Sequence, residues 1–315
     1  MSEHAPLRAG VVGVGYLGRF HAQKYAALPD VTLVGVVDID YARATAIAQE
    51  CHTRAFVDYH ELFDQVDCVS IVVPTQFHHA VALDFLQHGI DALVEKPLTA
   101  TGAEGRELVE AAAQHNRILQ VGHLERFNPA LRSLAGVLTA PRFIECHRVA
   151  PFVERGTDVD VVRDLMIHDL DVILSLVRSP VTSIEAFGVT VLTKEPDIAN
   201  ARLRFASGCV ANITASRVAL KRERKMRLFQ PDTYIVVDYG EHRIRICRRD
   251  PAPPTGSLPN ITYEEREVSG EDALEEEIRA FLRSVRERSE PIVSGHDGLQ
   301  ALEVAEQIIG CLEVP

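Results

Sequence analysis

Residues 10–22, GVVGVGYLGRFHA, decide the fold of this chain. They contain the spacing Gly13-x-Gly15-x-x-Gly18 between an apolar run at 7–12 and a predicted helix. Gly13 allows a tight turn, Gly15 lets a phosphate approach the backbone, and Gly18 lets the helix pack close to the strand. Amide groups at the start of the helix then favour an anion. The stretch therefore predicts a dinucleotide-binding turn.

An acidic residue in the expected place supports this interpretation. The second apolar run, 31–37, is followed by Asp38, twenty residues after Gly18. A carboxylate there can accept hydrogen bonds from the adenosine ribose hydroxyls, and it repels a 2′-phosphate. The next residues, Ile39 and Asp40, offer no cation for a 2′-phosphate, and the nearest cation is Arg43. The pattern therefore favours NAD over NADP. The alternative is a glycine turn in an unrelated α/β fold, with Asp38 capping a helix.

Strands and helices alternate through the first 122 residues. The apolar runs are typical of strands buried on both faces, so the pattern predicts right-handed crossovers and a covered parallel sheet. The expected strands lie at 7–12, 31–37, 67–73, 90–94 and 117–121, and the helices at about 16–28, 41–50, 76–88 and 102–115.

The pattern changes after residue 122. Strand candidates now follow one another directly, and HRIRIC (242–247) alternates polar and apolar residues as a half-exposed sheet does. We expect an α/β chain with a doubly wound Rossmann domain at 1–122 and an α+β domain at 123–315, built on a large open, mostly antiparallel sheet. The later strands are expected at 183–192, 199–206, 208–217, 224–229, 233–239, 242–248 and 261–268, and the later helices at about 129–139, 159–177, 271–287 and 296–312.

Composition excludes several classes of protein. A net charge of −12 argues against a nucleic-acid surface. The six cysteines are scattered with no CxxC pair, which indicates reduced thiols rather than disulfides or zinc. No apolar run approaches the roughly 20 residues of a membrane span. The first residues carry an acid and no apolar core, so we expect no signal peptide and a cytoplasmic protein with no membrane partner.

Chemically useful residues follow the predicted strands. Ligands of open parallel sheets bind beyond the carboxyl ends of the strands. Lys96, after the strand at 90–94, is thus expected beside the nicotinamide; a solvated strand end is the alternative. The expected cofactor contacts are Gly13, Gly15, Tyr16, Leu17, Gly18, Asp38, Ile39, Pro74, Thr75, His78, Glu95 and Lys96.

A helical motif in the second half carries a candidate base. Asp160, Asp164 and His168 are four residues apart, which places them on one helix face. An aspartate one turn before a histidine can orient its ring, and an ordinary pKa of about 6.5 suits proton transfer. The alternative is an exposed ion pair worth about 0.3–0.5 kcal/mol. A metal bound by His168 and Asp164 needs a third ligand on the same face, for which Asp171 is conceivable, but we expect no metal.

Three stretches together resemble the Gfo/Idh/MocA oxidoreductase family: GVGYLGRFHA (13–22), EKP (95–97) and DLMIHDLD (164–171). The resemblance covers nearly the whole chain. It implies a Rossmann domain joined to an α/β domain whose open sheet forms a homodimer or homotetramer. It also implies that Lys96, Asp164 and His168 are catalytic. In our hypothesis His168 removes a hydroxyl proton, Lys96 stabilises the oxygen and Asp164 orients His168, although Lys96 and His168 could exchange roles.

Two further stretches narrow the resemblance to one branch of the family. RGTDVDVVRDLM (155–166) lacks a paired glycine of many members, and with VGHLERFNPA (121–130) it is most similar to UDP-N-acetylglucosamine 3-dehydrogenases. Those enzymes produce a 3-keto sugar nucleotide on the route to lipid A carrying a 2,3-diamino sugar. The expected substrate contacts are Lys96, Arg126, Asn128, Arg163 and His168. Arg126 could instead form an interdomain salt bridge, and Asn128 could cap a helix starting at Pro129.

Other functions stay open at this point. The same chemistry could act on inositol, a hexose or a UDP-uronic acid, although the last needs a further cation for its carboxylate. A non-catalytic NAD(H)-sensing regulator is a rival, but it has no need of the three catalytic candidates together. The basic run RVALKRERKMR (217–227) is most commonly a solvated strand pair; a diphosphate contact or an intersubunit patch is the alternative.

Overall fold

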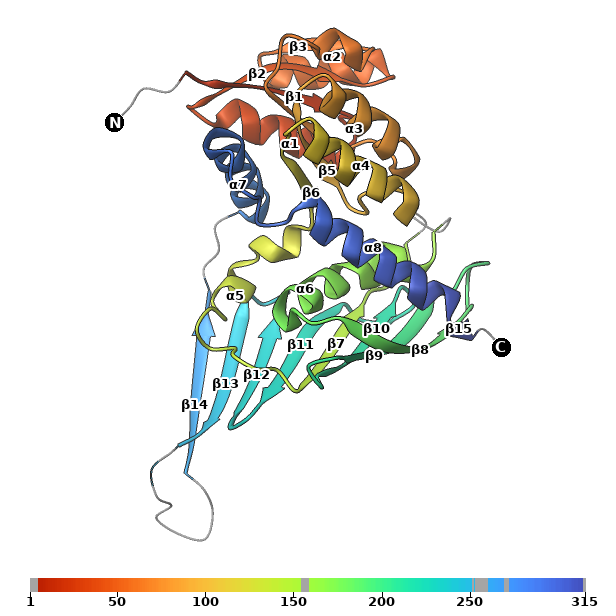
Figure 1. Ribbon diagram of the computed structural model, residues 1–315, viewed down its shortest axis with the longest axis vertical. Coiled ribbons are helices and arrows are strands. Elements are labelled where there is room, and N and C mark those ends of the chain that lie inside the picture. The colour runs from red at the N-terminus through yellow and green to blue at the C-terminus, as the bar shows by residue number, and fades with distance from the viewer. Residues whose placement is uncertain (1–4, 154–158, 251, 253–259, 269–271, 314–315) are drawn as a thin grey trace. The chain divides into compact units, whose positions relative to one another are not determined.

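The chain forms two compact units in a computed structural model, which describes residues 5–153, 159–250, 252, 260–268 and 272–313 (Figure 1). The first unit contains Met1–Leu124 and Asp272–Leu302, and the second contains Glu125–Glu271 and Glu303–Pro315. The chain thus first passes from one unit to the other near residue 124. Residues 272–302, although late in the chain, belong to the N-terminal unit.

The first unit is a doubly wound parallel sheet, as the alternation of strands and helices predicted. Its six strands lie in the order β3-β2-β1-β4-β5-β6, and every neighbouring pair is parallel. The order reverses between β1 and β4, and such sheets bind ligands at the carboxyl ends of the strands beside this reversal. The strands are β1 Leu7–Val12, β2 Val31–Val37, β3 Arg54–Phe56, β4 Cys68–Ile71, β5 Asp91–Glu95 and β6 Leu119–Gly122.

Helices lie on either side of this sheet. Helix α1 packs against α7, and α3 packs against α4 (Figure 1). The helices are α1 Tyr16–Ala27, α2 Tyr41–Glu50, α3 His78–Gln87, α4 Gly102–Gln114 and α7 Ala273–Glu287, with short 3-10 turns η1 Tyr59–Leu62 and η2 Thr75–Phe77. Helix α8, Gly295–Gly310, contributes its first half to this unit.

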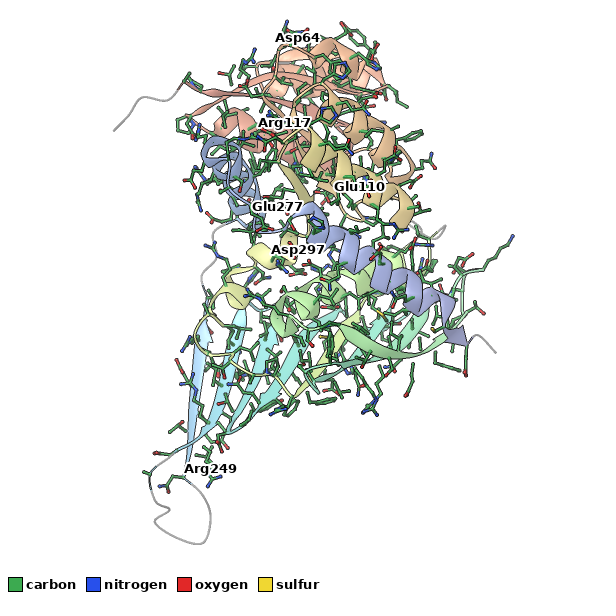
Figure 2. All side chains as sticks on the ribbon, viewed as in Figure 1. Asp64, Glu110, Arg117, Arg249, Glu277 and Asp297 are labelled. Atoms are coloured by element: carbon green, nitrogen blue, oxygen red, sulfur yellow. The ribbon has the colours of Figure 1, made fainter. Side chains whose placement is uncertain are left out.

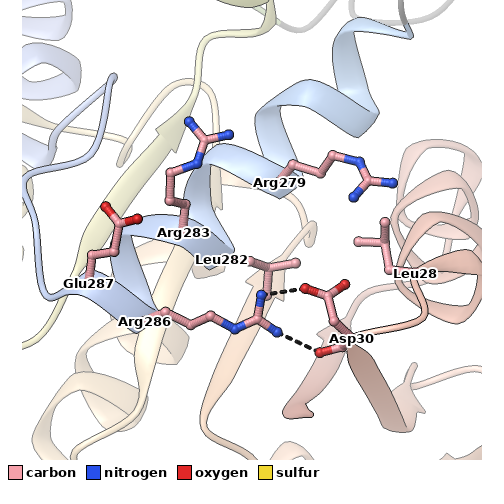
Figure 3. A pocket seen from close by; sticks show the side chains of 7 residues that line it. All are labelled: Leu28, Asp30, Arg279, Leu282, Arg283, Arg286 and Glu287. Atoms are coloured by element: carbon pink, nitrogen blue, oxygen red, sulfur yellow. Dashed lines mark hydrogen bonds and ion pairs between the residues drawn. The ribbon is translucent and has the colours of Figure 1, made fainter. Parts of the chain in front are cut away.

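Helix α7 comes late in the chain but belongs to the N-terminal core. Its buried side chains, Ile278 and Phe281 among them, join the apolar cluster formed by β1, β2 and α1. At the rim, the Arg286 guanidinium donates to both the carboxylate and the backbone carbonyl of Asp30 (Figure 3). Arg288 donates to the Asp91 carboxylate at 2.6 Å. Apolar burial and ion pairs therefore bind α7 to the Rossmann sheet.

The second unit is built on a nine-stranded sheet, which confirms the predicted large, mostly antiparallel sheet. The strand order is β14-β13-β12-β11-β7-β10-β9-β8-β15, and only β7–β10 and β8–β15 are parallel among its described pairs. Helices α5 and α6 cover one face (Figure 1). The elements are η3 Leu124–Phe127, α5 Pro129–Arg132, β7 Phe143–Val149, the π-helical turn η4 Val162–Met166, α6 Ile167–Val177, β8 Val181–Val189, β9 Ile198–Phe205, β10 Val210–Ser216, β11 Glu223–Gln230, β12 Thr233–Asp238, β13 Arg243–Arg249, β14 Ile261–Glu267 and β15 Leu312–Glu313.

Helix α5 is much shorter than the expected helix at 129–139. Asn128 caps it and Pro129 begins it, but it ends at Arg132. Gly136 then has a φ of +76°, outside the helical region. The Gln230 side chain accepts from the backbone of Thr139 and donates to the Val137 carbonyl, so tertiary hydrogen bonds replace helical ones. Among the described helices, none has the length and hydropathy to cross a bilayer.

Asp197 fixes the loop that enters β9. Its buried carboxylate accepts hydrogen bonds from the backbone N–H groups of Val191, Leu192 and Thr193 at 2.7, 2.6 and 3.0 Å. Burial opposes ionisation, but these N–H groups prevail and lower the pKa of Asp197 to about 2. The carboxylate therefore stabilises the fold only while it is charged.

The variant Asp197→Asn should lose about 2 kcal/mol of unfolding free energy at pH 7, the usual scale for hydrogen bonds to a charged group. A depressed pKa stabilises the fold above the unfolded pKa of roughly 3.9, and this contribution disappears as pH falls toward 2. Urea denaturation at pH 7 and pH 2.5 should therefore show the gap between wild type and variant narrowing in acid. An unchanged gap would contradict this role.

Candidate active site

The glycine turn between β1 and α1 has the geometry of a phosphate-binding loop. Gly13 has a φ of +86°, and a Cβ there would lie 2.6 Å from the Val72 carbonyl oxygen. A Cβ at Gly18 would lie 1.8 Å from the carbonyl oxygen of Gly13, so only glycine lets α1 start so close to the strand. A Cβ at Gly15 meets no atom within 4 Å, which leaves the backbone open to a ligand.

The start of α1 suits the pyrophosphate of NAD. Gly15 is its N-cap residue and supplies no side-chain cap, and the first turn carries no acid. The start of α1 thus carries neither a side-chain cap nor an acid that would compete with an anion. Tyr16, in this first turn, is exposed, and Leu17 beside it is half-buried.

Asp38 lies just beyond β2, where the ribose acceptor was predicted. Its buried carboxylate accepts hydrogen bonds from the N–H groups of Val14 and Asp40 at 3.1 and 3.0 Å. Arg43 approaches both oxygens of Asp38 at 3.3 Å, an ion pair that sequence reasoning did not assign. Ile39 is 95% exposed beside it and offers an apolar surface for the adenine. These residues fit the adenosine half of NAD.

His78 joins the ends of two strands. Its ring is buried, with Nδ1 2.9 Å from the Pro97 carbonyl oxygen and Nε2 2.9 Å from the Val73 carbonyl oxygen. Burial lowers the pKa of His78. The ring therefore holds the segment after β4, where Pro74 and Thr75 begin η2, next to the Lys96–Pro97 turn, whose peptide is cis. A direct contact between His78 and the cofactor stays a prediction.

A buried polar cluster holds Glu95, the residue that precedes Lys96 at the end of β5. The Glu95 carboxylate accepts from the Lys96 N–H at 3.2 Å and lies 3.1 Å from Nε2 of His21. Nδ1 of His21 lies 3.1 Å from the Ser70 hydroxyl. Glu277, labelled on α7 in Figure 2, completes a group with His21 and Glu95 in which one potential ligand atom from each residue lies within 4.8 Å of the others.

These three ligand atoms are close enough together to hold a cation, while His21 itself is bonded to Glu95 and Ser70. Sequence reasoning missed both His21 and Glu277. His21 lies in the glycine motif itself, three residues after Gly18, whereas nothing local to Glu277 marks it. The half-buried Lys96 is thus fixed at the end of β5 by contacts on both sides of its turn.

In the second unit, a π-helical turn precedes the candidate base. Asp160 accepts from the N–H groups of Val162 and Arg163 at 2.9 and 3.0 Å, and its other oxygen lies 3.3 Å from the Arg163 guanidinium. Asp160 therefore caps the segment. Single π turns recur at functional sites, and this one carries Asp164 just ahead of His168, both half-buried. Residues 155–158, which begin the stretch quoted for substrate specificity, lie outside the described residues.

A buried arginine holds the helix that carries His168. Arg148 of β7 donates to Asp169 through Nε at 2.8 Å and Nη2 at 3.1 Å, and to Glu125 through Nη1 at 3.0 Å. Burial raises the pKa of Asp169 against the charge of Arg148. Asp169 follows His168 directly, so Arg148 fixes the start of α6 on the sheet. Sequence reasoning missed Arg148; the signal is an arginine at an inward position of the alternating strand, in line with Cys146.

The other predicted substrate residues already have protein partners. Nη1 of Arg126 lies 3.6 Å from the Asp171 carboxylate within the second unit. Asn128 accepts from the Ala130 N–H at 3.0 Å as the cap of α5 and donates to Glu125 at 3.3 Å. The capping role of Asn128 is therefore what the structure shows, and substrate contacts by Arg126, Asn128 and Arg163 stay predictions.

The structure thus gathers the predicted residues into two groups. The glycine turn, Asp38, His78, Glu95 and Lys96 lie around the strand ends of the first unit, and Arg126, Asn128, Arg163, Asp164 and His168 belong to the second. The first group has the features of a nucleotide cradle: an open backbone at Gly15, an uncapped helix start and an acid beside it.

Known proteins resemble this chain along its length. A model of an oxidoreductase family with an NAD-binding Rossmann fold matches residues 7–123, and a Gfo/Idh/MocA C-terminal domain matches residues 135–241. The UDP-N-acetylglucosamine 3-dehydrogenase of Acidithiobacillus ferrooxidans is 40% identical, with 96% of each chain covered. A solved structure of that enzyme gives a TM-score of 0.92 over 98% of both chains. Inositol 2-dehydrogenase of Burkholderia ambifaria is 28% identical over 96% of this chain and 93% of its own.

Fold and site together define an oxidoreductase that uses NAD. The chain belongs to the Gfo/Idh/MocA family, as the three quoted motifs indicated. A levoglucosan dehydrogenase in complex with NADH, only 17% identical, shares the fold with a TM-score of 0.85.

Replacing Asp38 should change the preference between cofactors. Asp38→Ser removes the ribose acceptor and releases Arg43 to meet a 2′-phosphate, so NADH should bind about tenfold more weakly and NADPH more tightly. Fluorescence titration with both dinucleotides measures the shift. Adding Arg43→Ala should abolish the gain in NADPH affinity. An unchanged ratio between the two affinities would show that Asp38 does not face the ribose.

Replacing Arg148 should destabilise the second unit. Arg148→Met leaves Asp169 and Glu125 buried without their cation, which typically costs about 3–5 kcal/mol. The double variant with Asp169→Leu should recover part of that loss, because one uncompensated charge is gone. Urea denaturation followed by circular dichroism measures both. A loss below about 1 kcal/mol for Arg148→Met would contradict a buried ion pair.

Proposed function

We propose that this chain oxidises the 3-hydroxyl of UDP-N-acetylglucosamine to the 3-keto sugar nucleotide with NAD. The observation that carries the proposal is the 40% identity, over 96% of each chain, to an enzyme that bears this activity in its name. The inositol dehydrogenases are less similar over comparable coverage, which favours a sugar nucleotide over a polyol.

The N-terminal unit provides the binding site for the cofactor. Gly13 and Gly15 let the pyrophosphate meet the start of α1, and Asp38 accepts from the adenosine ribose. When bound, NAD accepts the two electrons and the hydrogen that leave the sugar carbon. Two contacts hold the turn that carries Lys96: His78 bonds the Pro97 carbonyl on one side, and the Glu95 carboxylate accepts from the Lys96 N–H on the other.

The proton of the 3-hydroxyl needs an acceptor on the protein. We assign this role to the imidazole of His168, with Asp164, one turn earlier, orienting the ring. The Lys96 ammonium donates a hydrogen bond to the same hydroxyl oxygen and stabilises the charge that develops as the proton leaves. The roles could be exchanged, because a desolvated lysine beside a cationic ring has a lowered pKa and can act as base.

The wider setting follows from the same assignment. We propose that the chain forms a homodimer or homotetramer through the face of its nine-stranded sheet that α5 and α6 leave uncovered (Figure 1). We place the enzyme in the cytoplasm, where NAD is available. Its 3-keto product suits an aminotransferase, in keeping with a role in making lipid A that carries a 2,3-diamino sugar.

The activity is tested by absorbance at 340 nm with UDP-N-acetylglucosamine and NAD. An aminotransferase and an amino donor should be present, because formation of a 3-keto sugar is unfavourable by itself. myo-Inositol and a UDP-uronic acid serve as competing substrates. We expect NADH formation with UDP-N-acetylglucosamine and not with the other two compounds. A preference for myo-inositol would refute the assignment.

The catalytic roles are tested by single variants at saturating substrate. Lys96→Ala and His168→Ala should each lower kcat at least about 100-fold while NADH still binds. If His168 is the base, wild-type kcat falls as the pH is lowered, because the ring must lose its proton before it can accept one from the substrate. That pH dependence should vanish in His168→Ala. Near-normal turnover in both variants would reject the scheme.

A further inference from the structure

The basic run at 217–227 divides into compensated and uncompensated cations. Lys225 lies 3.3 Å from Asp238, and Arg227 lies 3.1 Å from Glu145. Arg217 lies 3.7 Å from Asp197. Within the described parts of the chain, by contrast, the side chains of Lys221, Arg222 and Arg224 form no hydrogen bond or ion pair.

Strand register places Arg224 on the face of the sheet that the helices cover. In the antiparallel pair β11–β7, Arg224 lies opposite Arg148, and Met226 lies opposite Cys146. Directly opposed residues point to the same face. Arg148, Cys146 and Met226 are buried on that face, whereas Arg224, nearer the start of β11, is exposed. Arg224 is thus a solvent-accessible cation at the margin of this face.

The neighbouring charges do not cancel. Arg148 is compensated by Asp169 and Glu125, as described above. Arg224 lies in the field of the same two carboxylates but also in the repulsive fields of Arg148 and Arg222. Although the residue is exposed, partial desolvation by neighbouring atoms, and then Arg148, lower the pKa of Arg224. Two like charges opposed across a strand pair destabilise the sheet unless an anion joins them. The arrangement is therefore suited to an anionic ligand.

The same contacts relate Arg224 to the candidate base. Arg148 grips Asp169, and Asp169 follows His168 in the chain. The cross-strand neighbour of Arg148 accordingly lies on the side of the sheet where α6 begins. In a nucleotide sugar, a single sugar ring separates the 3-hydroxyl from the first phosphate. An anchor for the phosphates is thus expected near the base but not in contact with it.

We propose that Arg224 binds the diphosphate of a nucleotide-sugar substrate, with Arg222 and Lys221 beside it; this inference rests on the proposed function. A guanidinium matches phosphate oxygens with two parallel hydrogen bonds, which a lysine cannot do. The β11–β7 strand pair fixes the backbone of Arg224, and the planar guanidinium presents its donors in a rigid fork. The role explains why this cation is left uncompensated while Lys225 and Arg227 have acidic partners.

The test is titration of the NADH-bound, full-length protein with UDP by calorimetry. Arg224→Ala should weaken UDP binding about tenfold to hundredfold, the scale of a charge-assisted contact. Arg224→Lys should fall between the variant and wild type. Arg249→Ala is the matched control, because Arg249 ends β13 at the opposite end of the sheet from Arg224 (Figure 2). It should bind UDP within twofold of wild type.

Kinetics provide the second readout. Arg224→Ala should raise KM for UDP-N-acetylglucosamine by a similar factor and leave kcat within about threefold, because the contact is remote from the reacting hydroxyl. Unchanged NADH affinity shows that the variant is folded; Arg224→Gln replaces it if the alanine variant is not.

The outcomes separate the two claims. If wild type oxidises UDP-N-acetylglucosamine but the Arg224 variants keep its KM and its UDP affinity, this inference alone is wrong. If wild type neither binds UDP nor oxidises the nucleotide sugar, the proposed function and this inference fail together.

Discussion

The close approach of α1 to the end of β1 is the constraint on which the N-terminal unit depends. A side chain at Gly18 would overlap the Gly13 carbonyl, so two glycines let the helix begin at the edge of the sheet. The start of α1, which has no side-chain cap, then lies at the edge of the sheet where the strand order reverses. Asp38 is brought to the same edge and held there by the Val14 N–H. The predicted anion site and the predicted ribose acceptor thus both depend on one packing requirement.

The second unit depends on a charge rather than on a close approach. Arg148 is buried in the sheet and bonded to carboxylates on α6 and η3. Such a pair adds little net stability against an apolar core, but it fixes the register and position of the elements that it joins. Here those elements carry His168 and Arg126. A buried ion network thereby positions residues on two different segments. Apolar packing alone gives less directional control over such positions.

Local patterns predicted much of this structure because their causes are local. The conformations of Gly13, Gly15 and Gly18 follow from backbone geometry within six residues, and most strands follow from apolar runs or from alternation. The short edge strands β3 and β15 match no expected strand. The expected helix at 129–139 instead ends at Arg132, Gly136 lies outside the helical region, and Gln230 from a distant strand bonds the backbone of Val137 and Thr139. Asn128 caps α5, a local role that the sequence itself offered as an alternative.

The sequence by itself determined the class of fold, the use of NAD and the membership of the family, since each is indicated by short motifs whose geometry is set by neighbouring residues. Only the tertiary structure decided which charges are compensated and which distant segments share a core. His21 meets Glu95, Arg148 meets Asp169, and α7 returns to the Rossmann sheet across more than 150 residues of chain. Such contacts depend on strand order and register, which no local pattern specifies.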